Sequence, residues 1–222
     1  GLCAGAGFVM DVGCDHGKLA CALLRGGAAQ RVLATDVSPA SLAKAAARKR
    51  RCSLGHRLTL ALGNGLAPLG EDTADVIVIA GLGGEAIAAM LGKDVAAARR
   101  AGRLILQPMS RGGYLRRWLC ENGFRIAEET LAQDGGRVYE IIVAASGEDP
   151  LRPPGWPPGL YEIGWLPFAR RDPLARALLK KKLAARRKAL REAGAAAPAQ
   201  LSELVEQLTA LFALWEGQNQ CV

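Results

Sequence analysis

The first 146 residues of this chain alternate short apolar runs with segments of helical periodicity, and this alternation restricts the fold more than any other feature. Strands that alternate with helices indicate βαβ units, whose strands run parallel in one sheet. We expect five such strands at residues 8–12, 31–35, 58–62, 74–80 and 103–107. Helices are expected at residues 18–25, 39–51, 85–91 and 113–122. The predicted fold class is therefore α/β.

The last two strands of this region follow a different pattern. Residues 124–131 and 138–144 are rich in strand-forming residues and are joined by Asp134-Gly135-Gly136, which is typical of a hairpin turn. Five parallel strands followed by a hairpin predict the Rossmann-like seven-stranded methyltransferase sheet. The alternative is a nicotinamide-binding Rossmann domain, which normally ends on a sixth parallel strand instead.

Beyond this region the composition changes twice. Residues 150–158 are rich in Pro and Gly, which favours a linker, and we expect a domain boundary between residues 147 and 148. Two helical stripes follow, the second with the spacing of a heptad seam: Leu179, Leu183 and Leu190, then Leu201, Leu204, Leu208, Leu211 and Trp215. The short break at residues 194–198 predicts a coiled-coil-like antiparallel helical hairpin.

Charge and composition limit the partners. The net charge of +8 favours a polyanionic partner such as nucleic acid or an anionic membrane face, although a solvated basic surface is the alternative. No apolar run approaches the roughly 20 residues that cross a bilayer, and no signal peptide is evident, so we expect a soluble cytoplasmic protein with no membrane partner. The six Cys form no CxxC pair and the two His lack metal-ligand spacing, so neither a metal nor a disulfide framework is predicted.

The strongest local motif directly follows the first expected strand and opens a helix: Asp11-Val12-Gly13-Cys14-Asp15-His16-Gly17. Its glycines allow a sharp turn and close approach of a ligand. In a phosphate-binding loop the place of Asp15 belongs to a glycine, and the carboxylate there would repel phosphate. A cationic sulfonium cofactor suits this loop better, and an ordinary strand-to-helix turn is the alternative.

Three further segments lie at the ends of expected strands. Asp36 closes the second strand about 25 residues after Asp11, where a carboxylate can bind the ribose hydroxyls of an adenosine cofactor or cap the next helix. Asn64 follows the third strand and could read the adenine, although Asn-Gly is also a good turn. Residues 80–84, with the sequence Ala-Gly-Leu-Gly-Gly, follow the fourth strand at the edge where such folds bind ligands, so cofactor and target base would approach there unless the segment is only a tight turn.

Two absences narrow the chemistry. The fourth strand is not followed by an Asn-Pro-Pro-aromatic element, the arrangement that serves to methylate exocyclic amines. The turn at Gln107-Pro108 has no Cys that could act as a nucleophile toward C5 of a pyrimidine. A ring nitrogen with a free lone pair needs no base to deprotonate it, so positioning and electrostatics can suffice.

At these motifs the chain resembles the family of bacterial tRNA adenine-N1 methyltransferases that act on position 22. The resemblance spans nearly the whole first module at residues 11–16, 34–36, 63–66, 78–84, 104–108 and 138–141, and it continues at residues 161–164 of the tail. It implies a class I fold, S-adenosyl-L-methionine as cofactor and tRNA as partner, with residues 1–147 as the cofactor-binding domain and 148–222 as linker and tRNA-binding hairpin. It implies a cofactor site lined by Asp11, Gly13, Asp15, Asp36 and Asn64.

The remaining roles are hypotheses built on this resemblance. Ala80 and Gly81 would complete the cofactor site, Gly83 and Gly84 would approach the substrate, and Asp15 and His16 are the candidate catalytic residues. The interval from residue 170 to residue 191 holds ten basic residues and one acidic, which favours a grip on tRNA phosphates by Lys180, Lys181, Lys182, Arg186 and Arg187. A solvated helix surface is the alternative.

Two rival functions stay open at this point. The chain could methylate another RNA base or a small molecule, or it could be a non-catalytic RNA-binding protein with a vestigial cofactor fold. We expect a monomer or a weak homodimer, since a heptad seam can also join two chains.

Overall fold

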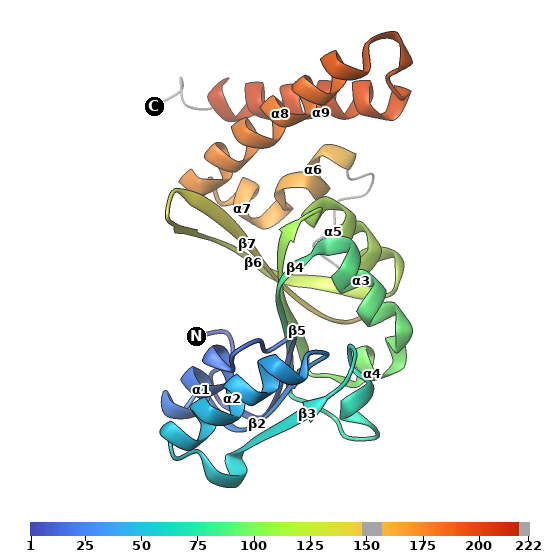
Figure 1. Ribbon diagram of the computed structural model, residues 1–222. Helices are drawn as coiled ribbons and strands as arrows, with labels where there is room; N and C mark the ends of the chain where they lie inside the picture. Colours follow the sequence, from blue (N-terminus) through green and yellow to red (C-terminus); the bar gives the residue numbers. More distant parts are fainter. Residues whose placement is uncertain (148–156, 218–222) are drawn as a thin grey trace.

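The computed structural model describes residues 1–147 and 157–217, and its centre is one seven-stranded sheet (Figure 1). The strands are β1 (Ala6–Val12), β2 (Ala29–Asp36), β3 (Leu58–Leu62), β4 (Val76–Gly83), β5 (Arg103–Ser110), β6 (Phe124–Asp134) and β7 (Arg137–Ser146). The helices are α1 (Lys18–Arg25), α2 (Pro39–Arg51), α3 (Gly84–Lys93), α4 (Val95–Arg100), α5 (Gly112–Glu121), α6 (Pro158–Ile163), α7 (Trp165–Ala169), α8 (Pro173–Ala193) and α9 (Ala199–Gly217). Short 3-10 turns cover Gly55–Arg57, Ala67–Leu69 and Gly194–Ala196.

The strand order is β3-β2-β1-β4-β5-β7-β6. The five strands β1 to β5 pair in parallel, whereas β7 runs antiparallel to both β5 and β6. The terminal hairpin therefore inserts its second strand beside β5, and the Rossmann-like methyltransferase sheet expected from the sequence is confirmed.

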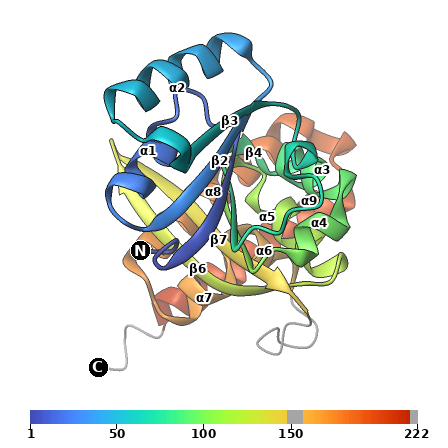
Figure 2. The same ribbon diagram turned by 90° about the horizontal axis from the view of Figure 1, so that it is seen from below.

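Helices cover both faces of this sheet, with α1 and α2 on one face and α3, α4 and α5 on the other (Figure 2). Alternate residues of each strand point to opposite faces. On β4, Ile77 and Ile79 join the cluster under α3 and α5, while Val76 and Val78 join the cluster under α1 and α2. Strands buried on both faces must be apolar throughout, which is why these runs carry no polar alternation.

The tail forms the expected helical hairpin, in which α8 and α9 lie side by side at the end of the molecule opposite α1 and α2 (Figure 1). Its heptad seam is filled by the chain itself. Leu208 and Leu211 of α9 pack with Leu179 and Leu183 of α8 and with α6, and Trp215 packs against Leu131 of β6 and part of α8. The most buried part of the seam is therefore not free to join a second chain.

A buried network of charges ties the hairpin to the sheet. Arg116 of α5 is fully buried, and its Nε lies 2.5 Å from Glu129 Oε1 of β6 while its Nη1 lies 2.7 Å from Glu140 Oε2 of β7. Arg116 Nη1 also donates to the Tyr161 carbonyl at 3.0 Å. Glu140 Oε1 in turn accepts from Lys182 Nζ of α8 at 2.6 Å. Four side chains from α5, β6, β7 and α8 thus share one desolvated network, here called the buried ion network.

Several elements differ from the expectation. The fourth strand continues through Gly83, so most of the Ala-Gly-Leu-Gly-Gly segment is strand rather than loop. Helices α4, α6 and α7 were not expected. The Pro-rich linker falls mostly on residues 148–156, outside the described residues, and the domain division at residue 147 stays a prediction. Among the helices that the structure describes, none is both long and apolar enough to cross a bilayer.

Candidate functional site

The candidate site lies at the carboxyl edge of the parallel strands, where the chain changes direction. From β1 the chain crosses to its neighbour β2, and from β4 it crosses to β5 on the other side, so β1 and β4 flank a topological switch point. Open α/β sheets bind ligands at such a point. Asp11, Asp36, Asn64 and Gly81 lie at or just beyond the carboxyl ends of β1, β2, β3 and β4, so four neighbouring strands bring them to one edge.

The loop between β1 and α1 is fixed to the end of β2 by backbone hydrogen bonds. The amides of Gly13 and Cys14 both donate to the Thr35 carbonyl, at 2.9 and 2.8 Å. The Asp15 amide donates to Asp36 Oδ2 at 2.9 Å, and Asp15 itself takes a left-handed conformation with φ of 48°. This left-handed turn leaves the Asp15 side chain exposed above the loop.

Asp36 joins two loops through its carboxylate. Its Oδ2 accepts from the Asp15 amide and its Oδ1 accepts from the Ser38 amide, each at 2.9 Å. The cap of α2 is Ser38, whose Oγ accepts from the Ser41 amide, so Asp36 supports the helix start without being its cap. A carboxylate has about four lone-pair sites, and two of them are left to accept ligand hydroxyls.

Asp11 is the buried acid of the site. Its side chain is almost fully buried, and Oδ2 has no hydrogen-bond partner among the described residues. Burial raises the pKa of Asp11 to about 6, the nearby Asp36 adds to the rise, and a hydrogen bond from the Ala20 amide at the start of α1 opposes it. A buried carboxylate oxygen without a donor is unfavourable and indicates a missing cationic or hydrogen-bonding partner.

The segment after β3 borders Asp36. The Gly63 amide donates to the Asp36 carbonyl at 3.0 Å, and Asn64 follows with an exposed side chain. Asn64 therefore lies beside Asp36 at the edge of the sheet, which is compatible with contact to the base of an adenosine. That contact stays a prediction.

The end of β4 is held by β5. The register of β4 against β5 shifts at Gly81, whose φ of +81° is one that residues other than glycine rarely adopt. The Gly81 amide is turned to Gln107 Oε1 of β5, to which it donates at 3.0 Å. From the sequence, Gln107 was noted as part of the Gln107-Pro108 turn but given no role, because nothing in its local pattern reveals that it reaches across to the neighbouring strand.

The two last glycines of this segment differ. Gly83 is half-buried near Ser110, so its predicted contact with substrate stays a prediction. Gly84 is buried, and a Cβ there would lie 2.3 Å from the Arg111 carbonyl oxygen. The close packing of α3 on the turn before α5 thus accounts for a glycine at position 84, and its contact with substrate stays a prediction.

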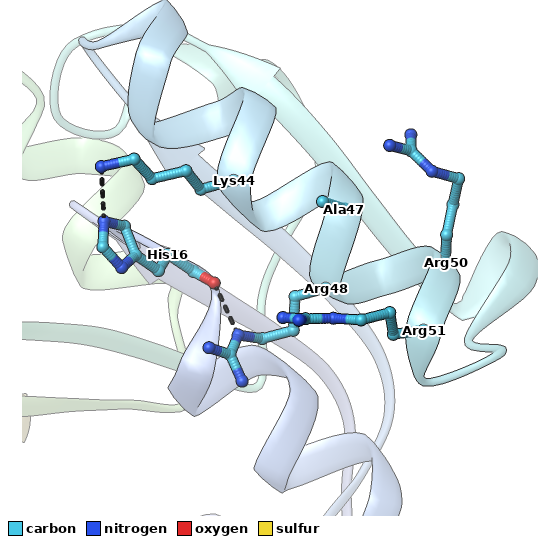
Figure 3. A pocket seen from close by; sticks show the side chains of 6 residues that line it. All are labelled: His16, Lys44, Ala47, Arg48, Arg50 and Arg51. Carbon is cyan, nitrogen blue, oxygen red and sulfur yellow. Dashed lines mark hydrogen bonds between the residues drawn. The ribbon is translucent and has the colours of Figure 1, made fainter.

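His16 connects the loop to α2 (Figure 3). Its Nε2 lies 3.3 Å from Asp15 Oδ1 and 3.1 Å from Lys44 Nζ, and its carbonyl accepts from Arg48 Nε at 2.9 Å. These contacts give His16 a structural place on the loop, and the catalytic role expected of Asp15 and His16 stays a prediction. Lys44 and Arg48 were not singled out from the sequence.

The chemistry of this edge suits a cation that carries hydroxyl groups. Asp11, Asp15 and Asp36 supply only hydrogen-bond acceptors, and neither Asp11 nor Asp36 is paired with a Lys or Arg among the described residues. A pyrophosphate would meet repulsion from these carboxylates. Residues 1–147 and 157–217 hold no group of three or more His, Cys, Asp or Glu side chains that could bind a metal ion.

The basic residues expected to grip RNA do not form one surface. Lys180, Lys181 and Arg187 are exposed on α8. Arg186 pairs with Glu162 of α6 at 3.1 Å. Lys182 corrects the expectation, because its ammonium faces inward to Glu140 and the Glu162 carbonyl, and burial outweighs the attraction of Glu140 and lowers its pKa. The helical repeat explains the split, since three consecutive residues of a helix cannot share one face.

Comparison with known proteins places this geometry among methyltransferases. The family described as "Methyltransferase domain" matches residues 2–142. A curated relative, the tRNA (adenine(22)-N(1))-methyltransferase of Bacillus subtilis strain 168, is 32% identical over 145 residues. The match covers 64% of this chain and 60% of the relative, so the aligned part spans less than two thirds of the relative's length.

Solved structures match over nearly the whole chain. Sp1610 of Streptococcus pneumoniae, crystallised in complex with S-adenosyl-L-methionine, is 27% identical and superposes with a TM-score of 0.82 over 95% of this chain and 94% of that one. The m1A22 tRNA methyltransferase TrmK of B. subtilis superposes with a TM-score of 0.78 over 96% and 92% of the two chains, and at 22% identity it supports the fold alone. These matches include the C-terminal hairpin as well as the sheet.

Proposed function

Because this chain belongs to the methyltransferase domain family, we propose that it transfers a methyl group from S-adenosyl-L-methionine to N1 of an adenine in tRNA. The observation that carries the proposal is the 32% identity to a B. subtilis enzyme named for that reaction at adenine 22. The cofactor follows from the acceptor-rich edge of the sheet and from the Sp1610 complex with S-adenosyl-L-methionine. We propose a cytoplasmic location for the enzyme. We also propose that it is a monomer or at most a weak homodimer, since most of its heptad seam is filled internally.

Bound at this edge, the cofactor supplies a methyl group carried on a positively charged sulfur. The free lone pairs of Asp36 are suited to the ribose hydroxyls, and Asn64 to the adenine edge. Asp11 brings a buried carboxylate whose free oxygen suits the positive charge of the cofactor. Asp15 contributes a second, exposed carboxylate on the same loop.

The target nitrogen determines what the protein must provide. N1 of adenine carries a free lone pair, so no side chain needs to remove a proton before the attack. The methylated ring is cationic, and carboxylates such as Asp15 stabilise positive charge that develops nearby. Gln107 holds Gly81 and thereby fixes the edge of β4 beside which the base would lie. N1 is hidden in a base pair, so the adenine must be unpaired or turned out of its helix.

The test is methyl transfer from labelled S-adenosyl-L-methionine into unmodified bacterial tRNA, followed by nucleoside analysis. We expect 1-methyladenosine, and we expect it to disappear when adenine 22 of the tRNA is replaced. Asp15→Ala should abolish cofactor binding or turnover, and an Asp15→Ala variant that keeps both would remove Asp15 from the site. Another methylated nucleoside would move the function to a different base, and cofactor or RNA binding without transfer would favour a non-catalytic binder.

A further inference from the structure

The outer face of α2 beside the cofactor loop is hollowed and strongly basic. An open cavity of about 460 Å³ is lined by His16, Lys44, Ala47, Arg48, Arg50 and Arg51 (Figure 3). No acidic side chain lines it. Lys44, Arg50 and Arg51 are exposed, and Arg48 is half-buried.

The basic surface continues across α1. A second open cavity of similar volume, about 460 Å³, shares Arg48 with the first and adds Lys18 and Arg25 of α1. These six cations form one surface, here called the basic face: Lys18, Arg25, Lys44, Arg48, Arg50 and Arg51. From residue 18 to residue 57 the sequence holds nine Lys and Arg but only one acidic residue, Asp36.

Nothing within the described chain neutralises this surface. No carboxylate forms an ion pair with any cation of the basic face in residues 1–147 and 157–217. Lys44 and Arg48 stand four residues apart and Arg48 and Arg51 three, spacings at which like charges on a helix repel by about 0.2–0.5 kcal/mol per pair. A surface that carries this repulsion without internal compensation is suited to an anionic partner.

The basic face joins the cofactor site directly. Arg48 donates a hydrogen bond to the His16 carbonyl, and Lys44 Nζ contacts the His16 ring. The preceding residue, Asp15, donates its backbone amide to the Asp36 carboxylate. The face therefore starts at the carboxyl edge of the sheet and extends along α2. It lies at the opposite end of the molecule from the α8 and α9 hairpin (Figure 1).

We infer that the basic face binds the sugar-phosphate backbone of the RNA substrate, so that α1 and α2 hold the RNA on one side of the catalytic edge and the hairpin meets it on the other. This inference rests on the proposed function. The cavities are open and no Phe, Tyr or Trp side chain lines them, so they are unsuited to enclosing a base or a free nucleotide. From Lys44 to Arg51 the helix rises about 10 Å at 1.5 Å per residue, enough to follow successive phosphates of one strand.

Arg50 and Arg51 provide the cleanest test. The described structure shows no hydrogen bond or ion pair from either side chain, so neutralising them leaves no buried group unpaired. The test variant is Arg50→Gln with Arg51→Gln. The matched control is Lys93→Gln with Arg100→Gln, which removes the same charge from exposed last-turn residues of α3 and α4 on the other face of the sheet.

The measurement is the affinity for an unmodified tRNA transcript over a range of salt concentrations, with transfer kinetics on the same tRNA and calorimetric binding of S-adenosyl-L-methionine. Each phosphate contact adds about 0.7–0.9 to the salt slope, so losing two should reduce the slope by between about one and two. The affinity at about 0.1 M salt should fall at least roughly tenfold and KM for tRNA should rise, with kcat and cofactor affinity kept. The control should match the unsubstituted protein.

Three results separate the inference from the function on which it rests. If Arg50→Gln with Arg51→Gln binds and methylates tRNA with the same salt slope as the control, the inference is wrong and the proposed function stands. If the unsubstituted protein binds tRNA through Arg50 and Arg51 without methylating it, the basic face is supported and the proposed function is wrong. If the substitutions abolish binding to anionic phosphatidylglycerol vesicles and leave tRNA binding intact, the face serves a membrane and the inference is overturned.

Discussion

Replacement of Arg116 by Met should strongly destabilise the folded protein, because Arg116 neutralises two carboxylates that water cannot reach. The side chains of Arg116 and Glu129 are each only 1% exposed, and Glu140 is 10% exposed. Removing one partner of a buried ion pair typically costs about 3–5 kcal/mol, since the other charge is left desolvated and unpaired. Arg116 serves two acids, so we expect about 4–5 kcal/mol, or a fall in Tm of roughly 8–20 °C for a chain of this size.

The loss of unfolding free energy in Arg116→Met should depend on pH. Burial alone would raise the pKa of Glu140, but Arg116 and Lys182 outweigh it and hold that pKa below its usual range. A carboxyl group whose pKa is lower in the folded than in the unfolded protein stabilises the fold at pH values above its unfolded pKa. This stabilisation is lost as the pH falls through the folded pKa. Without Arg116 the Glu140 pKa should rise, and a protonated Glu140 no longer needs a cation. The difference between Arg116→Met and the unsubstituted protein should therefore be smaller at pH 5 than at pH 8.

The assay is urea and thermal unfolding of both proteins at the two pH values. The control is the quadruple variant Arg116→Met, Glu129→Gln, Glu140→Gln, Lys182→Met, which removes all four charges of the buried ion network and should recover most of the loss, because replacing a whole buried ion cluster is often neutral. A loss below about 1 kcal/mol for Arg116→Met, or a quadruple variant no more stable than the single one, would refute the reasoning.

Three further predictions concern the cofactor edge. Burial mainly raises the Asp11 pKa to about 6, and a raised pKa gives stability at acid pH that is lost as the pH rises through about 6. Asp11→Asn should thus gain about 2–3 kcal/mol of unfolding free energy at pH 8 in cofactor-free protein while weakening cofactor binding, as urea unfolding and calorimetry can measure. Burial, then Asp11, Asp36 and Asp15, raise the pKa of Cys14 to about 12, so iodoacetamide at pH 8 should label Cys14 at least about a hundredfold more slowly in native than in denatured protein, measured by peptide mass spectrometry. Gln107→Ala should lower kcat roughly ten- to a hundredfold, and Gln107→Glu, which keeps an acceptor for the Gly81 amide, should restore most of the rate, as transfer kinetics can measure.

The central strands of the sheet could be predicted because they are buried on both faces. A run such as residues 76–80 must be apolar throughout, so the sequence records it directly. The helices α6 and α7 could not be predicted, because they span only six and five residues and are held by contacts with distant elements. Leu160 and Ile163, for example, pack on α8 and α9. Such tertiary contacts leave little periodicity in a short segment.

The site divides in the same way. Asp11 and Asp36 could be predicted because residues at the carboxyl ends of parallel strands lie at the edge where such sheets bind ligands. Gln107 and Arg48 act through partners 26 and 32 residues away in the chain, and no local pattern marks such pairs. Lys182 was assigned to RNA for the opposite reason, because its sequence neighbours are solvated and its partner Glu140 lies 42 residues away.

The buried ion network also restricts how this protein can change over generations. The four charges balance one another, so substitutions at residues 116, 129, 140 and 182 are coupled. A protein that loses only one of them is destabilised, because its partner is left buried and unpaired. We therefore expect exchanges at these positions to be paired, with an acid and a base lost together. A hairpin transplanted from a relative would be accepted only if it brought a residue compatible with Glu140, so the tail and the sheet are expected to evolve together.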